Sequence, residues 1–361
     1  MKIMERIALG RTVWLVTAGV GLLILGALYT IFGTEASFAP ALDKAKTSDA
    51  HVPSEGIAPI EEPDYSYEVS TVTFGGSCTP GSMLGSAAYG TFNGALAENG
   101  TGYFFENLSG IFASDGFTLA GLDVTLTDRE LTPAEKESRE WFCAPVSAAE
   151  VFAGIDALSL EFDRTMDYGT EGYADTQTAL EAAGIHWCDT GRAVYRELES
   201  GVKIAVYCCE LDADQAENVK SWLASAKEKA DFTALYLSDT EETYMPSESK
   251  TALMQSYIDA GADLVVGTNG AKLQPSAEYG DGFIAYSLGS LIDGATRYHE
   301  DYTALLQVEL QSKNGELTGV EYRFIPCYTA DGDQSWRPTE IAGDNERENV
   351  LAFLRGERPR P

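Results

Sequence analysis

Residues 158–185 read LSLEFDRTMDYGTEGYADTQTALEAAGI and contain one strand, one turn and one helix. An apolar strand is expected over residues 157–162, and it runs into the charged turn Asp163-Arg164. A glycine-punctuated loop follows, and a helix is expected over residues 175–183. Proteins with α/β folds place their chemistry at the carboxyl ends of such strands, because the loops there face a crevice. The side chains at this turn should therefore decide what the protein does.

Strand-like and helical runs alternate on both sides of this unit. Apolar strands are expected over residues 70–74, 203–208, 232–237, 263–267 and 283–288, and helices over residues 103–113, 215–230 and 248–260. This alternation predicts a largely covered α/β sheet. Further on, Asn314-Gly315 separates two alternating runs at 304–310 and 319–325, which is typical of a hairpin. The later part is thus more antiparallel, and we expect a core of two mixed sheets.

The N-terminal region contains an apolar segment. Residues 12–33 hold no charged side chain in 22 positions. That length spans a hydrocarbon core of roughly 30 Å at about 1.5 Å per helical residue. Lys2, Arg6 and Arg11 precede the segment, so the positive-inside rule puts the N-terminus in the cytoplasm. We expect a single-pass anchor in the cell membrane with the rest extracellular; a cleaved signal peptide, with a shorter apolar region, is the alternative. Either interpretation places the domain that follows outside the cytoplasm.

Composition divides the chain into five parts. A stretch rich in proline, serine and acidic residues follows the apolar segment, and it is typical of an extended linker. The chain ends in a tail with one candidate short helix over residues 346–354. The expected parts are a cytoplasmic N-terminus (1–11), a transmembrane anchor (12–33), a flexible extracellular tether (34–68), an α/β domain (69–330) and a C-terminal tail (331–361).

The net charge of −31 comes from 56 acidic and 25 basic residues. This excess excludes nucleic acid as a partner, because phosphates require a basic footprint. There are six cysteines and no C-x-x-C pair, which argues against a zinc ribbon. An exported domain can form disulfides, and the sequence leaves their pairing open. Cys208 and Cys209 end an apolar strand, and we expect them to be buried free thiols.

Several short blocks occur in a fixed order along residues 69–330. They are TFGG at 73–76 followed by CT at 78–79, YFFEN at 103–107, DYG at 167–169 with GY at 172–173 and DT at 175–176, DAGADLVVG at 259–267, LQP at 273–275 and YSLG at 286–289. This pattern resembles the CapA family of poly-γ-glutamate and capsule biosynthesis proteins, relatives of calcineurin-like metallophosphatases. The resemblance implies a metallophosphatase-like layered sandwich of mixed sheets flanked by helices, here with one N-terminal transmembrane helix.

The positions that would carry the family's divalent metals depart from its pattern. The resemblance places Ser77 where the family has an aspartate, Asp123 where it has a glutamate, Phe162, Asp163 and Arg164 where it has Asn-Asn-His, and Leu237 where it has a histidine, while Glu241 keeps an acid and Asn269 lies in a block that has lost its histidines. Only three histidines occur in the chain: His51, His186 and His299. Dinuclear hydrolytic sites need several imidazoles and carboxylates. We therefore expect no metal cofactor and a protein that is not an enzyme.

A rebuilt site is the alternative. Ser77, Asp123, Asp163, Glu241 and Asn269 are all oxygen donors, and oxygen donors favour Ca²⁺ or Mg²⁺. If they ring one crevice, the chain is an active hydrolase with a new ligand set.

Arg164 allows three interpretations. An arginine does not release its proton at neutral pH, so it cannot act as a general acid. It can bind a carboxylate or phosphate in fork geometry, pair structurally with Asp163 or Asp167, or lie beside a rebuilt metal site. Glu161, in an otherwise apolar strand, is either a sheet-edge residue or a buried partner for Arg164.

The family resemblance implies a role in making, exporting or anchoring poly-γ-glutamate or another anionic envelope polymer. The altered positions favour a non-catalytic protein that binds the polymer or scaffolds its synthesis and export proteins. The hydrolase and a surface-binding domain unrelated to capsule remain alternatives. Because both this chain and such a polymer are anionic, polymer binding requires that basic residues gather locally.

Overall fold

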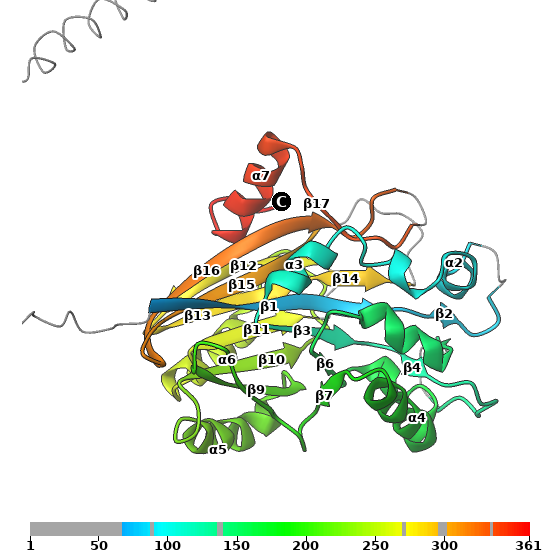
Figure 1. Cartoon of the computed structure of the whole chain (residues 1–361), viewed down its shortest axis with the longest axis horizontal. Helices are drawn as coiled ribbons and strands as arrows, with labels where there is room; N and C mark the ends of the chain where they lie inside the picture. Colours follow the sequence, from blue (N-terminus) through cyan, green and yellow to red (C-terminus); the bar gives the residue numbers. More distant parts are fainter. Residues whose placement is uncertain (1–66, 87–89, 136–139, 269–271, 295–301, 333–334) are drawn as a thin grey trace, which may run out of the picture. The chain divides into compact units, whose positions relative to one another are not determined.

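The computed structural model in Figure 1 describes residues 67–86, 90–135, 140–268, 272–294, 302–332 and 335–361. The expected N-terminus and anchor (1–33) and nearly all of the expected tether lie outside these residues, as does Asn269. Within the described part of the chain, none of the helices is both long and apolar enough to cross a membrane.

The first main sheet joins strands from both ends of the domain. Its order is β17-β16-β15-β1-β3-β6-β7, with β14 also paired to β1. Strands β1, β3, β6, β7 and β14 run parallel, and β15, β16 and β17 are antiparallel. The strands are β1 (Tyr67–Thr79), β3 (Phe117–Leu122), β6 (Ala157–Ser159), β7 (His186–Cys188), β14 (Ser290–Asp293), β15 (Tyr302–Lys313), β16 (Glu316–Tyr328) and β17 (Thr339–Glu340).

The second main sheet has the order β12-β13-β11-β10-β9-β8, parallel at its centre and antiparallel at both edges. Its strands are β8 (Val194–Glu197), β9 (Lys203–Glu210), β10 (Phe232–Ser238), β11 (Leu264–Thr268), β12 (Leu273–Tyr279) and β13 (Gly282–Leu288). A small third sheet contains β2 (Ser82–Met83), β4 (Thr125–Leu126) and β5 (Phe142–Ala144).

The two main sheets share one apolar layer, and helices cover their outer faces (Figure 1). Val72 and Leu119 of the first sheet pack with Val206 and Ala234 of the second. Helices α2 (Phe92–Asn99), α3 (Ser109–Ser114) and α4 (Gly169–Ala182) contribute to the core outside the first sheet, and α5 (Ala216–Ala226) and α6 (Glu248–Asp259) to the core outside the second. The prediction of mixed sheets flanked by helices is confirmed.

The C-terminal residues pack on the domain. Helix α7 (Asp344–Leu354) buries Val350, Phe353 and Leu354 against Leu273 and Ala304. The Ser276 hydroxyl of β12 also donates to the Leu354 carbonyl at 2.7 Å.

The 304–325 hairpin is confirmed. Lys313 pairs with Glu316, and the two turn residues, Asn314 and Gly315, have φ of 54° and 82°. Positive φ at both positions is what a type I′ turn requires, and asparagine and glycine tolerate it best.

Two local expectations are wrong. A single helix does not cover residues 103–113: a 3₁₀ turn at Thr101–Tyr103 and helix α3 from Ser109 occupy this region. Helix α4 begins at Gly169, six residues before the expected start at 175. The sequence misplaced this start because Gly172 resembles a loop residue. In the structure Gly172 lies on the packed face of the helix, where a Cβ would lie 2.7 Å from the Thr125 methyl carbon. The glycine permits close contact between helix and strand.

Candidate functional site

The predicted site residues of the first sheet lie at one sheet edge. Strands β1, β3 and β6 are parallel neighbours, with Ser77 beside Gly121 and Gly121 beside Ser159. Asp123 follows β3, and Asp163 begins the 3₁₀ turn after β6. The expected strand over 157–162 ends at Ser159, because the chain then turns and the Leu160 carbonyl accepts a bond from the Thr165 hydroxyl.

Asp123 and Arg164 form an ion pair at this edge. The guanidinium of Arg164 lies 2.7 Å from the Asp123 carboxylate, and the Arg164 backbone N–H donates to the same group at 3.0 Å. Asp123 is 1% exposed. Burial raises the pKa of Asp123, and the charge and hydrogen bonds of Arg164 oppose that rise. The guanidinium also covers the Phe142 ring at 4.7 Å from its centroid. Asp123 is a partner that the sequence does not indicate for Arg164.

An aromatic ring fills the space beside this ion pair. Phe162 is 6% exposed, and a Cβ added to Gly121 would lie 2.3 Å from its ring. On the same side of Gly121, the Tyr236 hydroxyl donates to the Gly75 carbonyl at 2.8 Å. Phe162 therefore acts as a core residue at the position where the resemblance puts a polar ligand.

The other expected ligands have separate neighbours. The Ser77 hydroxyl lies 3.3 Å from that of Ser290. Glu241 accepts from the Ser247 N–H at 2.8 Å and the Ser247 hydroxyl at 3.1 Å, so it holds the loop before α6. No group of three or more metal-binding side chains gathers among the residues that the structure describes. Since Asp123 binds Arg164 and Glu241 binds Ser247, these residues do not fit a divalent-metal centre of the family type.

A pocket of about 300 Å³ lies at the ends of β6, β7, β9 and β10, and we call it the strand-end pocket. Of the described residues, no lysine, arginine or histidine lines it. Its acidic lining residues are Glu161, Asp163, Asp189, Glu210 and Asp239.

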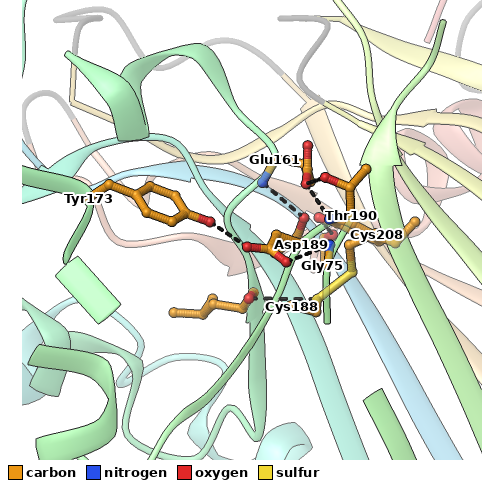
Figure 2. The surroundings of a disulfide bond; sticks show 11 residues. Gly75, Glu161, Tyr173, Cys188, Asp189, Thr190 and Cys208 are labelled. Carbon is orange, nitrogen blue, oxygen red and sulfur yellow. Dashed lines mark hydrogen bonds between the residues drawn. A yellow bond between two sulfur atoms is a disulfide. The ribbon is translucent and has the colours of Figure 1, made fainter. Parts of the chain in front are cut away.

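Some of these acids are held by neighbouring groups, as Figure 2 shows. Glu161 accepts from the backbone N–H and the hydroxyl of Thr190, so it is not the partner of Arg164. The Tyr173 hydroxyl donates to Asp189 at 2.8 Å. Burial, followed by the charges of nearby acids including Asp163, raises the pKa of Glu210.

A disulfide joins Cys188 of β7 to Cys208 of β9, next in sequence to Asp189 of the pocket lining (Figure 2). It joins the edge strand of one main sheet to a strand of the other. The expectation that both Cys208 and Cys209 are free thiols is therefore wrong for Cys208. Side chains alternate along a strand, so Cys208 faces the layer between the sheets and Cys209 faces the α5–α6 layer. Cys209 remains a thiol, and burial raises its pKa to about 12.

The family model described as "Bacterial capsule synthesis protein PGA_cap" matches residues 71–295. The chain belongs to the PGA_cap family. It is also 26% identical over 280 residues to the capsule biosynthesis protein CapA of Bacillus anthracis. That match covers 69% of this chain and 66% of the relative, just under two thirds of its length. A hypothetical protein from Thermus thermophilus aligns with a TM-score of 0.45 and 12% identity, covering 71% of this chain and 99% of that one.

Sequence reasoning missed one buried charge cluster of this PGA_cap domain. Lys250 of α6 is 4% exposed, and its ammonium contacts the Asp239 carboxylate and, at 2.7 Å, the Gln274 side-chain oxygen. The signal was present, because Lys250 stands at helical spacing from the buried residues Met254 and Tyr257. A lysine on an apolar helix face needs a buried acid, and here that acid lines the strand-end pocket.

Proposed function

We propose that this PGA_cap protein takes part in making or anchoring a bacterial capsule and that its role is non-catalytic. It binds poly-γ-glutamate or another anionic polymer, or it scaffolds the synthesis and export proteins of that polymer. Family membership and the similarity to CapA support the link to capsule biosynthesis. The observation that carries the non-catalytic role is the ion pair between Arg164 and the buried carboxylate of Asp123. A positive side chain of the protein occupies the neighbourhood where the resemblance puts metal ligands.

Two features at the strand ends disfavour a catalytic metal there. A metal that activates water needs open carboxylates, and breaking a buried ion pair to free one is costly. The Phe162 ring, packed on Gly121, occupies further space at this edge. The same protein can still bind a polymer elsewhere on its surface, because recognition of a polyanion requires only placed cations and shape.

The catalytic question is tested with the purified full-length chain in detergent. It is incubated with a chromogenic phosphodiester and with a γ-linked glutamate oligomer, each with Mg²⁺, Mn²⁺ or Ca²⁺. We expect no turnover above that of the Asp123→Asn variant. Turnover that Asp123→Asn abolishes would contradict the proposal and establish the hydrolase with rebuilt oxygen ligands.

Polymer binding is tested with the same chain on immobilised poly-γ-glutamate, and a neutral polyglutamine resin is the control. We expect retention on the acidic resin only. Arg164→Ala should leave that retention unchanged, because Asp123 already binds the guanidinium. Failure to bind the acidic resin, with no recovery of synthesis or export proteins in a pull-down, would overturn both forms of the non-catalytic role.

The proposal includes a membrane anchor at residues 12–33 and an extracellular domain, on the basis of the uncharged segment and the basic residues before it. The full chain should stay in carbonate-washed membranes, and deletion of residues 12–33 should release it. Protease added to intact cells should digest the domain. If the domain resists protease until the cells are lysed, it lies on the cytoplasmic side and the proposed topology is wrong.

A further inference from the structure

A second hollow, of about 160 Å³, lies between β7 and β8, and we call it the β7–β8 cleft. These strands are the end strands of the two main sheets. The side chains that matter here are those of His186, Trp187, Arg192 and Arg196.

The charge of this cleft is opposite to that of the molecule. The chain has 56 acidic and only 25 basic residues, yet two arginines and a histidine line the cleft. None of the described residues that line it is acidic. Basic residues therefore do gather locally, as polymer binding by an acidic protein requires.

The two arginines are presented differently. Arg192 stacks over the Trp187 ring at 4.2 Å from its centroid, and its guanidinium lies 3.6 Å from exposed Glu181. An ion pair this exposed contributes little and leaves the guanidinium accessible. Arg196 is exposed and forms no ion pair with the residues that the structure describes.

Strand geometry directs Arg196 toward the cleft. Side chains two residues apart on a strand share a face, so Arg196 lies on the same face of β8 as Val194. Val194 packs against the core between the sheets. Tyr195 lies on the opposite face, near Trp222, with the Lys229 ammonium 5.8 Å from its ring centroid. Arg196 thus stands where the layer between the sheets opens to solvent.

We infer that the β7–β8 cleft binds the free α-carboxylates of an acidic polypeptide, a chain of γ-linked glutamates. The inference rests on the proposed function and assigns its polymer site. Guanidinium groups hold carboxylates in fork geometry, and the Trp187 ring suits the methylene groups between them. The net charge of the protein does not prevent binding, because salt screens exposed charges beyond about 8 Å under physiological conditions.

The test uses the full-length chain and a short, fluorescently labelled oligomer of γ-linked glutamates, with a glutamine oligomer of equal length as the neutral probe. Fluorescence anisotropy measures the Kd of the parent chain and of the Arg192→Gln/Arg196→Gln double variant. We expect the double variant to bind the glutamate oligomer about tenfold or more weakly, since charge-assisted hydrogen bonds are lost. Both arginines are exposed, so the thermal midpoint should stay unchanged.

Arg347→Gln is the matched control. Arg347 of α7 has a side chain 50% exposed and pairs with Asp344, much as the 45% exposed Arg192 pairs with Glu181. Its substitution removes one charge away from the cleft and should change the Kd by less than about twofold.

The outcomes separate the two proposals. If the parent chain binds and the double variant binds equally well, the cleft is not the site, while polymer binding stands. If the parent chain binds the glutamate and glutamine oligomers equally, or binds neither, both the assignment of the cleft and the polymer-binding form of the proposed function fail.

Discussion

The strand-end pocket and the β7–β8 cleft are hollows of one domain with opposite charge. In the pocket, acids bind groups of the chain itself: Asp239 binds buried Lys250, Asp189 accepts from Tyr173, and Glu161 accepts from Thr190. In the cleft, the arginines lie exposed. A charge held by the chain therefore serves the fold, whereas an accessible charge can serve a ligand.

A strand of three residues separates the two hollows. His186 and Trp187 line the cleft, Asp189 and Thr190 line the pocket, and Cys188 between them forms the disulfide. Changes within the pocket should therefore alter stability and leave oligomer binding intact, whereas a change at the disulfide should affect both.

Replacing Lys250 with alanine should have the largest effect. The side chains of Lys250 and Asp239 are 3% and 8% exposed, so loss of the cation leaves an uncompensated buried carboxylate. We expect a loss of about 3–5 kcal/mol in the free energy of unfolding, measured by urea titration. Lys220→Ala, which removes an exposed ion pair with Glu217, should cost less than about 1 kcal/mol. Equal costs for the two variants would mean that the pocket is not held by its buried pair.

The fold was largely predictable because its signals are local. Apolar runs of strand length and the Asn314-Gly315 turn need no knowledge of distant residues. The site was less predictable because its contacts are distant in sequence. Asp123 and Arg164 are 41 positions apart, and nothing along the chain indicates that β3 and β6 are neighbours that bring them together.

The disulfide could not be predicted for the same reason, because its pairing depends on how distant strands are arranged. Cys208 and Cys209 are equivalent as neighbours in an apolar run, and only the faces of β9 distinguish them. Cys208 faces the layer that also contains Cys188, and Cys209 faces the helices. Edge strand β8 was not predicted because it is mostly exposed and carries no apolar run.

Removing the disulfide should have the second-largest effect. The Cys188→Ala/Cys208→Ala variant loses a crosslink with a sequence separation of 20 residues, which is worth about 3 kcal/mol in the chain-entropy description. Because β7 forms a wall of the cleft, we also expect weaker binding of the glutamate oligomer. Urea titration and anisotropy measure the two effects, and Cys143→Ala, at a free cysteine, is the control. Stability of the parent chain that is unaffected by reductant would refute this role of the disulfide.

Gly121→Ala should have a smaller effect, which is confined to the stability of the domain. Its Cβ would lie 2.3 Å from the Phe162 ring, so the ring must move, at a cost of about 1–3 kcal/mol. Phe162→Leu in the same chain should recover part of this loss by removing the ring. Gly110→Ala in α3 is the control, because a Cβ there meets nothing within 4 Å. Oligomer affinity should not change; a Gly121→Ala variant as stable as the parent would show that Phe162 does not fill this space tightly.

The smallest effect concerns Glu210 on the rim of the pocket. Burial and the charges of Asp163, Asp212 and Glu161 raise its pKa in the folded protein. A raised folded-state pKa means that the stability contribution is present below the unfolded pKa and is lost as pH rises through the folded pKa. Glu210→Gln should therefore be more stable than the parent at neutral pH, by about 0.5 kcal/mol or less, and this gain should vanish in acid.

Asp175→Asn is a control of opposite sign. A hydrogen bond from Arg129 lowers the pKa of Asp175, so its contribution is present above the unfolded pKa and is lost as pH falls through the folded pKa. This variant should be less stable than the parent at neutral pH and equal to it in acid, as measured by urea midpoints across the pH range. If Glu210→Gln instead destabilised the protein at neutral pH, the Glu210 carboxylate would have a favourable partner. The contrast between a pocket of mutually repelling acids at its rim and a cleft of accessible cations would then no longer hold.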